Sequence, residues 1–301
     1  MTNAIETDGL TRHFGRTRAV DRLTLQIPAG RTFALIGPNG AGKTTTLQLV
    51  LNLLRPQHGV ARLLGCDSRR LGSAQFQRVG YVSEDQQLPD WMTFSQLLDF
   101  CRPLYPDWDE GLAAQLARSL NLTSGVPLRT LSRGTRMKAR LVATLAYRPD
   151  VILLDEPFTA LDPLVRDELV RCLLEVAAET PRTVVIASHD IDEVERVADW
   201  VGFMVEGRLL FAEPVAALLA RFRLVEVGGT GAHRPPLHPL WIPQTPTASA
   251  LRFVDPTHGQ PEAAARIAAA FPAADVRTTT MSLRDIVVAL AGRASVDRTQ
   301  E

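Results

Sequence analysis

Three short segments of the sequence carry residues of the kinds that bind and cleave phosphates. The first is a glycine-rich run that ends in a lysine and two threonines: Gly37, Pro38, Asn39, Gly40, Ala41, Gly42, Lys43, Thr44 and Thr45. The second, at residues 131–135, contains a serine and a glycine, and the third, at residues 151–156, is an apolar run that ends in two carboxylates. The first segment predicts binding of a nucleoside triphosphate, and the other two would each supply a further part of a phosphate site.

The glycine-rich run has the composition of a phosphate-binding loop. Its three glycines leave room for backbone N–H groups to surround the β-phosphate at the start of a helix. Lys43 is placed to reach the β- and γ-phosphates, and the hydroxyl of Thr44 is placed to ligate Mg²⁺. A glycine-rich turn without a ligand is the alternative. The lysine argues against it, because the whole chain contains only one other.

The third segment predicts the catalytic carboxylates. Residues 151–154 show no alternation of apolar and polar positions, which predicts a strand buried on both faces. Ligands of open α/β sheets bind at the C-terminal ends of the strands, where Asp155 and Glu156 stand. Asp155 can hold the Mg²⁺ shell through water, and Glu156 can act as the general base on the attacking water. An acidic strand end before a proline turn is the alternative.

The second segment comes directly before an expected helix. The Ser132 hydroxyl and the neighbouring amides would form an anion-binding helix N-terminus, or merely a polar helix cap without a ligand. Here the chain resembles the ATP-binding subunits of ABC transporters, whose signature usually reads Leu-Ser-Gly-Gly-Gln. Leu131, Ser132 and Gly134 match this pattern, and Arg133 and Thr135 depart from it.

The resemblance implies a particular assembly. The signature segment would act in trans, clamping the γ-phosphate of ATP held by the glycine loop of a partner subunit. Two ATP molecules would then be buried in a head-to-tail dimer, formed either by two copies of the chain or by two different subunits. In this interpretation the residues of the signature that bind ATP are Ser132, Arg133, Gly134 and Thr135.

Three further positions take their roles from the resemblance. Phe14 stands where an aromatic residue would stack on adenine, although an aromatic residue at a strand end is as often part of a core. Asp162 belongs to a loop that crosses the dimer interface, and an aspartate before a proline is also an ordinary helix cap. His189 matches the histidine that contacts the γ-phosphate, which completes a catalytic set with Lys43 and Glu156.

The resemblance also marks a difference after residues 80–83. Members of the family usually have glutamine where this chain has Glu84, at the hinge between the ATP-binding core and the helical insertion. A carboxylate can still ligate Mg²⁺, so Glu84 joins Thr44 and Asp155 as an expected metal ligand. Alternatively, Gln86 or Gln87 takes this role after a shift of the loop.

The elements that must position these residues follow a βα rhythm. Strands are expected near residues 23–27 and at residues 33–36, and a helix over residues 44–52. Helices are expected over residues 94–101, 109–120 and 136–147. The rhythm then resumes with strands at 151–154, 183–187, 201–205 and 208–211 and helices from 162 and near 191–198. Strand, helix, strand and helix follow at 251–254, 261–271, 276–279 and 282–290.

These elements predict an α/β fold, a P-loop NTPase core with an N-terminal antiparallel β subdomain and a helical insertion, plus a small C-terminal α+β appendage. We expect an ATP-binding domain over residues 1–222, with the insertion at about 85–147. The change to glycine and proline predicts a linker over residues 223–250. Residues 251–301 would form an accessory domain.

Composition narrows the class of protein further. Lys+Arg and Asp+Glu both total 33 in 301 residues, so no net charge favours nucleic acid as a partner, and none is expected. The separated Cys66, Cys101 and Cys172 suit a reducing compartment and are expected to be packing residues. No apolar run approaches the roughly 18 residues of a membrane span, and no signal sequence is evident. We expect a soluble cytoplasmic protein.

The leading interpretation is an ATPase that drives a membrane transporter. The integral-membrane permease would be a separate chain that docks near the helical insertion, with Trp91, Phe94 and Leu98 as contacts, and would hold the protein at the cytoplasmic face of the membrane. Residues 281–286 resemble the tail of subunits paired with drug or lipid exporters, which favours export. The alternatives are a soluble ABC-type ATPase acting on DNA or ribosomes, and a small-molecule kinase.

Overall fold

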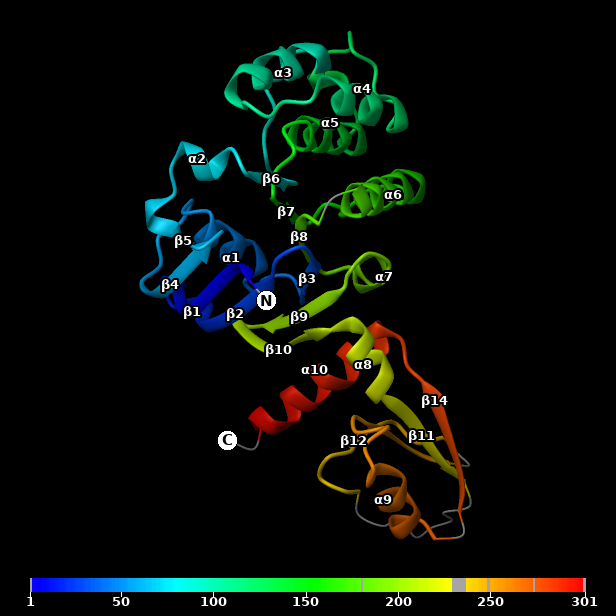
Figure 1. Cartoon of the computed structure of the whole chain (residues 1–301). Helices are drawn as coiled ribbons and strands as arrows, with labels where there is room; N and C mark the ends of the chain where they lie inside the picture. Colours follow the sequence, from blue (N-terminus) through cyan, green and yellow to red (C-terminus); the bar gives the residue numbers. More distant parts are fainter. Residues whose placement is uncertain (1, 180, 229–236, 248–249, 273, 300–301) are drawn as a thin grey trace. The chain divides into compact units, whose positions relative to one another are not determined.

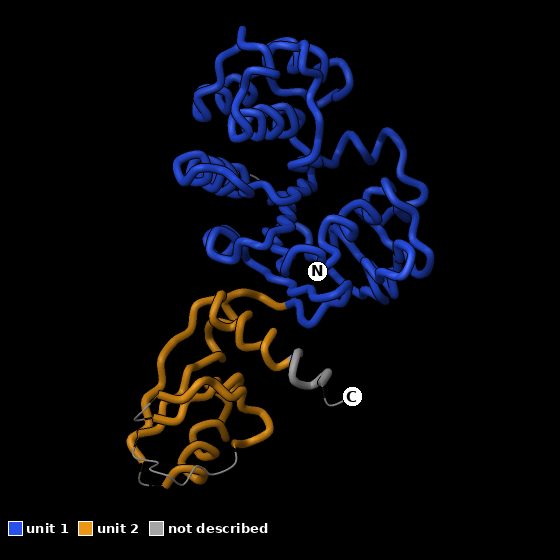
Figure 2. The backbone as a smooth tube through the Cα atoms, turned by 180° about the vertical axis from the view of Figure 1, so that it is seen from behind, with its two compact units in different colours: residues 1–212 blue, residues 213–301 orange. Residues whose placement is uncertain are grey.

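The chain divides into two compact units, Met1–Ala212 and Glu213–Glu301, which Figure 2 distinguishes by colour. The structure, a computed structural model, describes residues 2–179, 181–228, 237–247, 250–272 and 274–299. No helix in this described part is both long and apolar enough to cross a membrane. Each unit has its own sheets and its own buried core, and each is described here by itself.

An antiparallel sheet begins the first unit. Its strand order is β2-β1-β4-β5. The strands are β1 (Asn3–Phe14), β2 (Thr17–Pro28), β4 (His58–Leu63) and β5 (Cys66–Asp67). Leu23, Leu25 and Ile27 are buried while the residues between them are exposed, so the alternation in the sequence correctly predicted a sheet with one covered face.

A second, largely parallel sheet positions the candidate site. Its strand order is β10-β9-β3-β8-β7-β6, with β3, β8, β9, β7 and β6 in parallel pairs. The strands are β3 (Thr32–Ile36), β6 (Val79–Ser83), β7 (Val151–Asp155), β8 (Thr183–Ser188), β9 (Trp200–Val205) and β10 (Arg208–Pro214). All residues of β3, β7 and β8 are buried, as their unbroken apolar runs predict.

The register of the parallel sheet brings three loops to one edge. Ile36 at the end of β3 pairs with Ser188 at the end of β8, and Asp155 at the end of β7 pairs with Ala187. The glycine loop, the two carboxylates and the histidine segment therefore leave neighbouring strands at the same edge. This is where ligands bind in open α/β sheets.

The helices of the first unit follow the predicted pattern closely. Helix α1 follows the glycine loop, and Figure 1 shows α3, α4 and α5 gathered in one region beyond the end of β6. The helices are α1 (Lys43–Val50), α2 (Ser73–Phe76), α3 (Phe94–Cys101), α4 (Glu110–Ser119), α5 (Arg133–Leu145), α6 (Pro163–Glu179) and α7 (Ile191–Glu195). Helix α5 begins earlier than the sequence suggested, because Ser132 caps it.

A shared hydrophobic core joins the two sheets of the first unit. Leu10 and Leu23 from the antiparallel sheet pack in one cluster with Phe33 of β3, Leu47 of α1 and Leu153 of β7, and each of these side chains is at most 2% exposed. Burial of this much apolar surface is the main favourable term in folding. It fixes α1, and with it the glycine loop, against both sheets.

In its described residues, the second unit consists of an antiparallel sheet and three helices. Its strand order is β12-β13-β11-β14, and β11 lies between β13 and β14. The elements are α8 (Val215–Arg221), β11 (Arg223–Gly228), β12 (Ile242–Pro243), β13 (Ala250–Asp255), α9 (Ala263–Ala270), β14 (Asp275–Thr280) and α10 (Leu283–Thr299). The α+β character of this segment is as expected.

The division between the units differs from the sequence expectation. The boundary falls after Ala212 instead of residue 222, and the expected linker at 223–250 begins with β11, an inner strand of the sheet. Val225 and Val227 of β11 are fully buried in the core of the second unit. The proline and glycine residues that suggested a linker follow this strand, and residues 229–236 among them lie outside the described part of the chain.

Candidate functional site

The glycine loop connects β3 to α1 and is shaped by contacts with distant backbone. The φ angles are 157° at Gly37, 80° at Gly40 and 101° at Gly42, in a region that side chains strongly disfavour. A Cβ at Gly42 would lie 2.1 Å from the Ala19 carbonyl oxygen, and one at Gly37 would lie 2.2 Å from that of Met204. A Cβ at Gly40 would meet nothing within 4 Å, so the loop is open to a ligand there.

Lys43 lies inside the loop, where the phosphates are expected. Its side chain is 4% exposed, and Nζ donates to the carbonyl oxygens of Gly37 at 2.8 Å and Pro38 at 3.2 Å. Nζ also lies 3.2 Å from Oε1 of Glu156. A buried cation requires such partners, because transfer from water without them is costly. The lysine is thus held inside the loop by carbonyl and carboxylate oxygens, which phosphate oxygens can replace.

Thr44 and Asp155 form an oxygen pair next to the lysine. The Thr44 hydroxyl donates to Oδ1 of Asp155 at 2.8 Å, and the Tyr81 hydroxyl donates to Oδ2 at 3.4 Å. Burial raises the pKa of the Asp155 carboxyl, and the hydrogen bond from Thr44 opposes this shift. A hydroxyl and a buried carboxylate are the hard oxygen donors that Mg²⁺ prefers, so these residues fit that ion.

Glu156 is in contact with the other expected catalytic groups. Oε2 lies 2.7 Å from Nδ1 of His189 and accepts from the Thr159 hydroxyl at 3.1 Å. Its backbone φ is 51°, and its N–H donates to the carbonyl oxygen of Ala187 on β8 at 2.8 Å. A glutamate in this region of φ is unusual, and such strain concentrates at functional sites. The strained turn directs the carboxylate toward both Lys43 and His189.

Five of the six side chains expected to act on the phosphates and the metal are therefore brought together within one unit, and Glu84 is the sixth. The five are Lys43, Thr44, Asp155, Glu156 and His189. Sequence reasoning missed two hydroxyls at this site, Tyr81 and Thr159. Thr159 had a signal, since it follows Glu156 by three residues, whereas Tyr81 reaches the site because β6 pairs with β7, which the sequence did not indicate.

The signature segment is not joined to the glycine loop of its own chain. Ser132 caps α5 by accepting from the Thr135 amide at 3.2 Å, and its hydroxyl lies 2.8 Å from the Thr135 hydroxyl. Among the described residues, no hydrogen bond or ion pair links this segment to residues 37–45. Gly134 is buried, and a Cβ there would lie 3.0 Å from Cγ1 of Val165 on α6. The glycine thus allows α5 and α6 to pack closely.

The loop after β6 connects the carboxylate region to α5. The Glu84 amide donates to the Asp155 carbonyl oxygen at 3.3 Å, while the Glu84 carboxylate forms an ion pair with Arg133. In the described part of the chain, no hydrogen bond joins the Glu84 carboxylate to the side chain of Thr44 or Asp155. Gln86, the alternative ligand, has its carbonyl oxygen bound to Arg140. The metal-ligating role of either residue stays a prediction.

Phe14 and Asp162 have simple local surroundings. The Phe14 ring is not part of the core: it is 46% exposed, and the Arg12 guanidinium lies 4.9 Å from its centroid. Asp162 caps α6 by accepting from the Val165 amide at 3.0 Å. Stacking of Phe14 on adenine and a position of Asp162 at a dimer interface both stay predictions.

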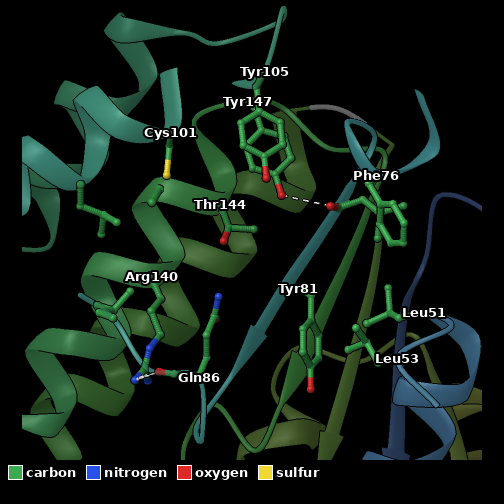
Figure 3. A pocket seen from close by; sticks show the side chains of 14 residues that line it. Leu51, Leu53, Phe76, Tyr81, Gln86, Cys101, Tyr105, Arg140, Thr144 and Tyr147 are labelled. Carbon is green, nitrogen blue, oxygen red and sulfur yellow. Dashed lines mark hydrogen bonds between the residues drawn. The ribbon is translucent and has the colours of Figure 1, made fainter. Parts of the chain in front are cut away.

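A cleft of about 300 Å³ lies beside the site and was not foreseen from the sequence. Figure 3 shows Leu51 and Phe76 on one side of it, and Arg140 of α5 and Tyr147, which follows this helix, on the other. Tyr105 stacks on Tyr147 with ring centroids 3.7 Å apart. Phe76 and the neighbouring Leu53 are 39% and 59% exposed. The cleft is thus a mixed surface, with apolar and aromatic side chains beside polar groups such as Arg140 and Gln86, open to solvent between α1 and the helical insertion.

The expected membrane contacts are only partly available. Trp91 is 74% exposed, whereas Phe94 is 2% exposed and cannot contact another protein. Thr93 and Gln96 form a capping box at the start of α3, and Phe94 in the first turn of this helix is buried. The prediction that Phe94 is a contact residue is therefore wrong, while Leu98 is half-buried.

Comparison with known proteins gives a consistent result. A protein-family model described as ABC transporter matches residues 20–159. The chain is 30% identical to the daunorubicin/doxorubicin resistance ATP-binding protein DrrA of Streptomyces peucetius, over 100% of this chain and 96% of that protein. It is 29% identical to the bacitracin transport ATP-binding protein BcrA of Enterococcus faecalis, over 74% of this chain and 73% of that protein.

A further relative and two solved structures cover less of the chain. The sulfate/thiosulfate import ATP-binding protein CysA of Yersinia pseudotuberculosis is 35% identical over 68% of this chain, which spans 59% of that relative. An ATP binding subunit of an ABC transporter matches with a TM-score of 0.65 at 23% identity, over 72% of this chain and 92% of that one. cbiO1 from Clostridium perfringens matches with a TM-score of 0.61 at 26% identity, over 71% and 89%.

Proposed function

The chain belongs to the family of ABC transporter ATP-binding subunits, and we propose that it pairs head to tail with a second such subunit to drive a separate membrane permease. It is an ATPase of this family. The observation that carries the proposal is the grouping of Lys43, Thr44, Asp155, Glu156 and His189 at one edge of the parallel sheet, with the signature segment outside that group. Such a chain supplies most of one ATP site and a part of another.

The roles of the site residues follow from their contacts. Lys43 binds the β- and γ-phosphates, exchanging the Glu156 carboxylate and the loop carbonyls for phosphate oxygens. Thr44 and Asp155 would hold Mg²⁺, which neutralises charge on the phosphate oxygens when it is bound. Departure of Lys43 leaves Glu156 free to accept a proton from water.

Hydrolysis then takes place in one displacement at the γ-phosphorus. The water oxygen forms a bond to the γ-phosphorus as its proton passes to Glu156, and the bond from that phosphorus to the β–γ bridging oxygen breaks. The products are ADP and inorganic phosphate. His189, 2.7 Å from the Glu156 carboxylate, holds this base in place and is positioned to contact the γ-phosphate.

The position of the signature segment supports a dimer. Ser132 and the amides at the start of α5 form an anion-binding helix N-terminus, and Ser132 is exposed. No described contact joins it to the glycine loop of the same chain. A second subunit turned head to tail would bring its γ-phosphate to this segment, so two ATP molecules would be bound between two subunits.

The cleft beside α5 is the surface to which we expect the permease to bind. It is lined by apolar and aromatic side chains from the ATP-binding core and from the helical insertion, including exposed Phe76. A cytoplasmic segment of a permease inserted here would contact both parts at once. Movement of the insertion during closure would then pass directly to the membrane protein.

Export is the direction we favour. DrrA and BcrA are named for drug resistance and bacitracin transport, whereas CysA is named for import. The match to DrrA covers this whole chain, the second unit included, whereas the match to CysA covers 68% of it. We propose that residues 213–301 act as an accessory domain of an exporter and that the protein associates with the cytoplasmic face of the membrane through its permease.

Co-purification tests the proposal. The tagged full-length chain, isolated from solubilised membranes with ATP, should bring with it an integral-membrane protein and a second ATP-binding subunit. Glu156→Gln should hold the two ATP-binding subunits together as a dimer in the presence of ATP. Sedimentation with ribosomes or DNA and never with membranes would instead support a soluble ATPase, and phosphorylated product without free phosphate would support a kinase.

A further inference from the structure

Glu84 is held at three points, and two of them belong to the same helix. Its amide donates to the carbonyl oxygen of Asp155, at 3.3 Å. Its own carbonyl oxygen accepts from Arg140 at 3.2 Å, and its carboxylate pairs with Arg133. Arg140 also donates to the carbonyl oxygen of Gln86, a contact marked in Figure 3. The loop after β6 therefore bridges the end of β7 and the first two turns of α5.

The positions of the two arginines on α5 explain how they reach one loop. Residues seven apart lie on the same side of an α-helix, two turns from each other. Arg133 is in the first turn, and Arg140 is buried, 8% exposed, against the loop backbone. Arg133 therefore faces the side chain of Glu84 while Arg140 fixes the backbone beside it.

The ion pair answers an electrostatic problem that Arg133 creates. A cation at the N-terminus of a helix is unfavourable, because the helix dipole is positive there. The first turn of α5 contains no acidic residue, so the nearest compensation comes from Glu84 on another element. Both residues depart from the usual family pattern, because Arg133 stands in place of glycine and Glu84 in place of glutamine. The two departures therefore form one interaction.

We propose that Glu84 and Arg133 form an exchangeable ion pair that ties the loop after β6 to the signature end of α5 until ATP and its metal bind. In this scheme Arg133 is a positioning residue that acts through Glu84, a role that takes the place of the direct contact with ATP expected from the sequence. The proposal rests on the proposed ATP site, where Glu84 is an expected ligand of Mg²⁺. The Glu84 carboxylate is engaged by Arg133, so its ligation of a metal held by Thr44 and Asp155 would exchange Arg133 for the metal and free the signature segment for a partner.

Amide hydrogen exchange of the full chain without nucleotide tests the pair directly. Amides over residues 84–88 include those of Glu84 and Gln86, whose hydrogen bonds should open more often once the pair is lost. The Arg133 side chain is 50% exposed, so the expected acceleration in Arg133→Ala is modest, about two- to fivefold. Arg129→Ala removes an exposed arginine just before α5 and serves as the matched control.

Exchange is compared first without nucleotide and then with it. Arg133→Ala and Glu84→Gln should each accelerate exchange over residues 84–88, with no further gain in the double variant and no change in Arg129→Ala. Equal exchange in Arg133→Ala and Arg129→Ala would overturn the pair. With Mg²⁺ and a non-hydrolysable ATP analogue, the wild type and Arg133→Ala should exchange alike, and a persisting difference would overturn the exchange of partners. Failure of the wild type to bind the analogue would instead refute the ATP site, while the nucleotide-free arm still judges the pair.

Discussion

Two glycines of the phosphate loop should respond very differently to the same substitution. Gly40 and Gly42 have φ angles of 80° and 101°, so alanine is strained at both, by about 1–2 kcal/mol. At Gly40 the added methyl group meets nothing within 4 Å, whereas at Gly42 it would lie 2.1 Å from the Ala19 carbonyl oxygen. The overlap forces the backbone to shift, which adds about 1–3 kcal/mol for Gly42→Ala alone.

The difference is large enough to measure by scanning calorimetry of the nucleotide-free chain. A domain of 150–250 residues loses about 2–4 °C in melting temperature per kcal/mol, so Gly42→Ala should melt roughly 2–12 °C below Gly40→Ala. For ATP affinity we expect the opposite order: relative to its loss of stability, Gly40→Ala should lose more affinity than Gly42→Ala. The proposed site brings the phosphates to the open space at Gly40, so Gly40→Ala should lose ATP affinity with little loss of stability.

Equal melting temperatures of the two variants would refute this reasoning. The same holds if Gly42→Ala melts like the wild type, because the contact with Ala19 would then not constrain the loop. Such a result would leave phosphate binding as the common reason for both glycines.

Three further predictions concern the charged groups of the site. Glu156→Gln should retain ATP binding and lower the hydrolysis rate by about 10²–10⁴-fold, measured as phosphate release; normal turnover would remove Glu156 from its role as base. Lys43→Ala should weaken ATP binding at least about tenfold by calorimetric titration, whereas Lys138→Ala, which breaks the pair with Glu168, should not. Burial raises the pKa of Asp155 above 3.8, so the folded state favours the protonated carboxyl and the ionised form lowers stability at neutral pH. Asp155→Asn should therefore stabilise the nucleotide-free chain near pH 7, and the gain should disappear as the pH falls through the raised pKa to about 4; a gain independent of pH would contradict this cause.

The expected fold was predictable because its signals are local. Unbroken apolar runs predicted β3, β7 and β8, helical spacing predicted α1, and helical spacing with the caps Thr93 and Asp109 predicted α3 and α4. The second unit was less predictable. β11 is an inner strand only because β13 and β14 pair with it from both sides, and nothing within residues 223–228 indicates those partners.

The candidate site, like the fold, was only partly predictable from the sequence. The glycine loop and the strand-end carboxylates follow from residue types and spacing, since each must be contiguous to act. The contacts of Lys43 and His189 with Glu156 join residues 113 and 33 positions apart, so they depend on the order of the strands in the sheet. The buried position of Phe94 likewise depends on how α3 packs.

The sequence by itself determined that this chain binds and hydrolyses ATP as an ABC-type subunit, because the loop, the signature and the carboxylates are short segments with recognisable residues. The tertiary structure decided which of those residues meet in one chain and which do not. It placed Glu84 against Arg133, left Ser132 apart from the glycine loop, and opened a cleft beside α5. These features arise from packing between elements distant along the chain, and such packing leaves no local pattern in the sequence.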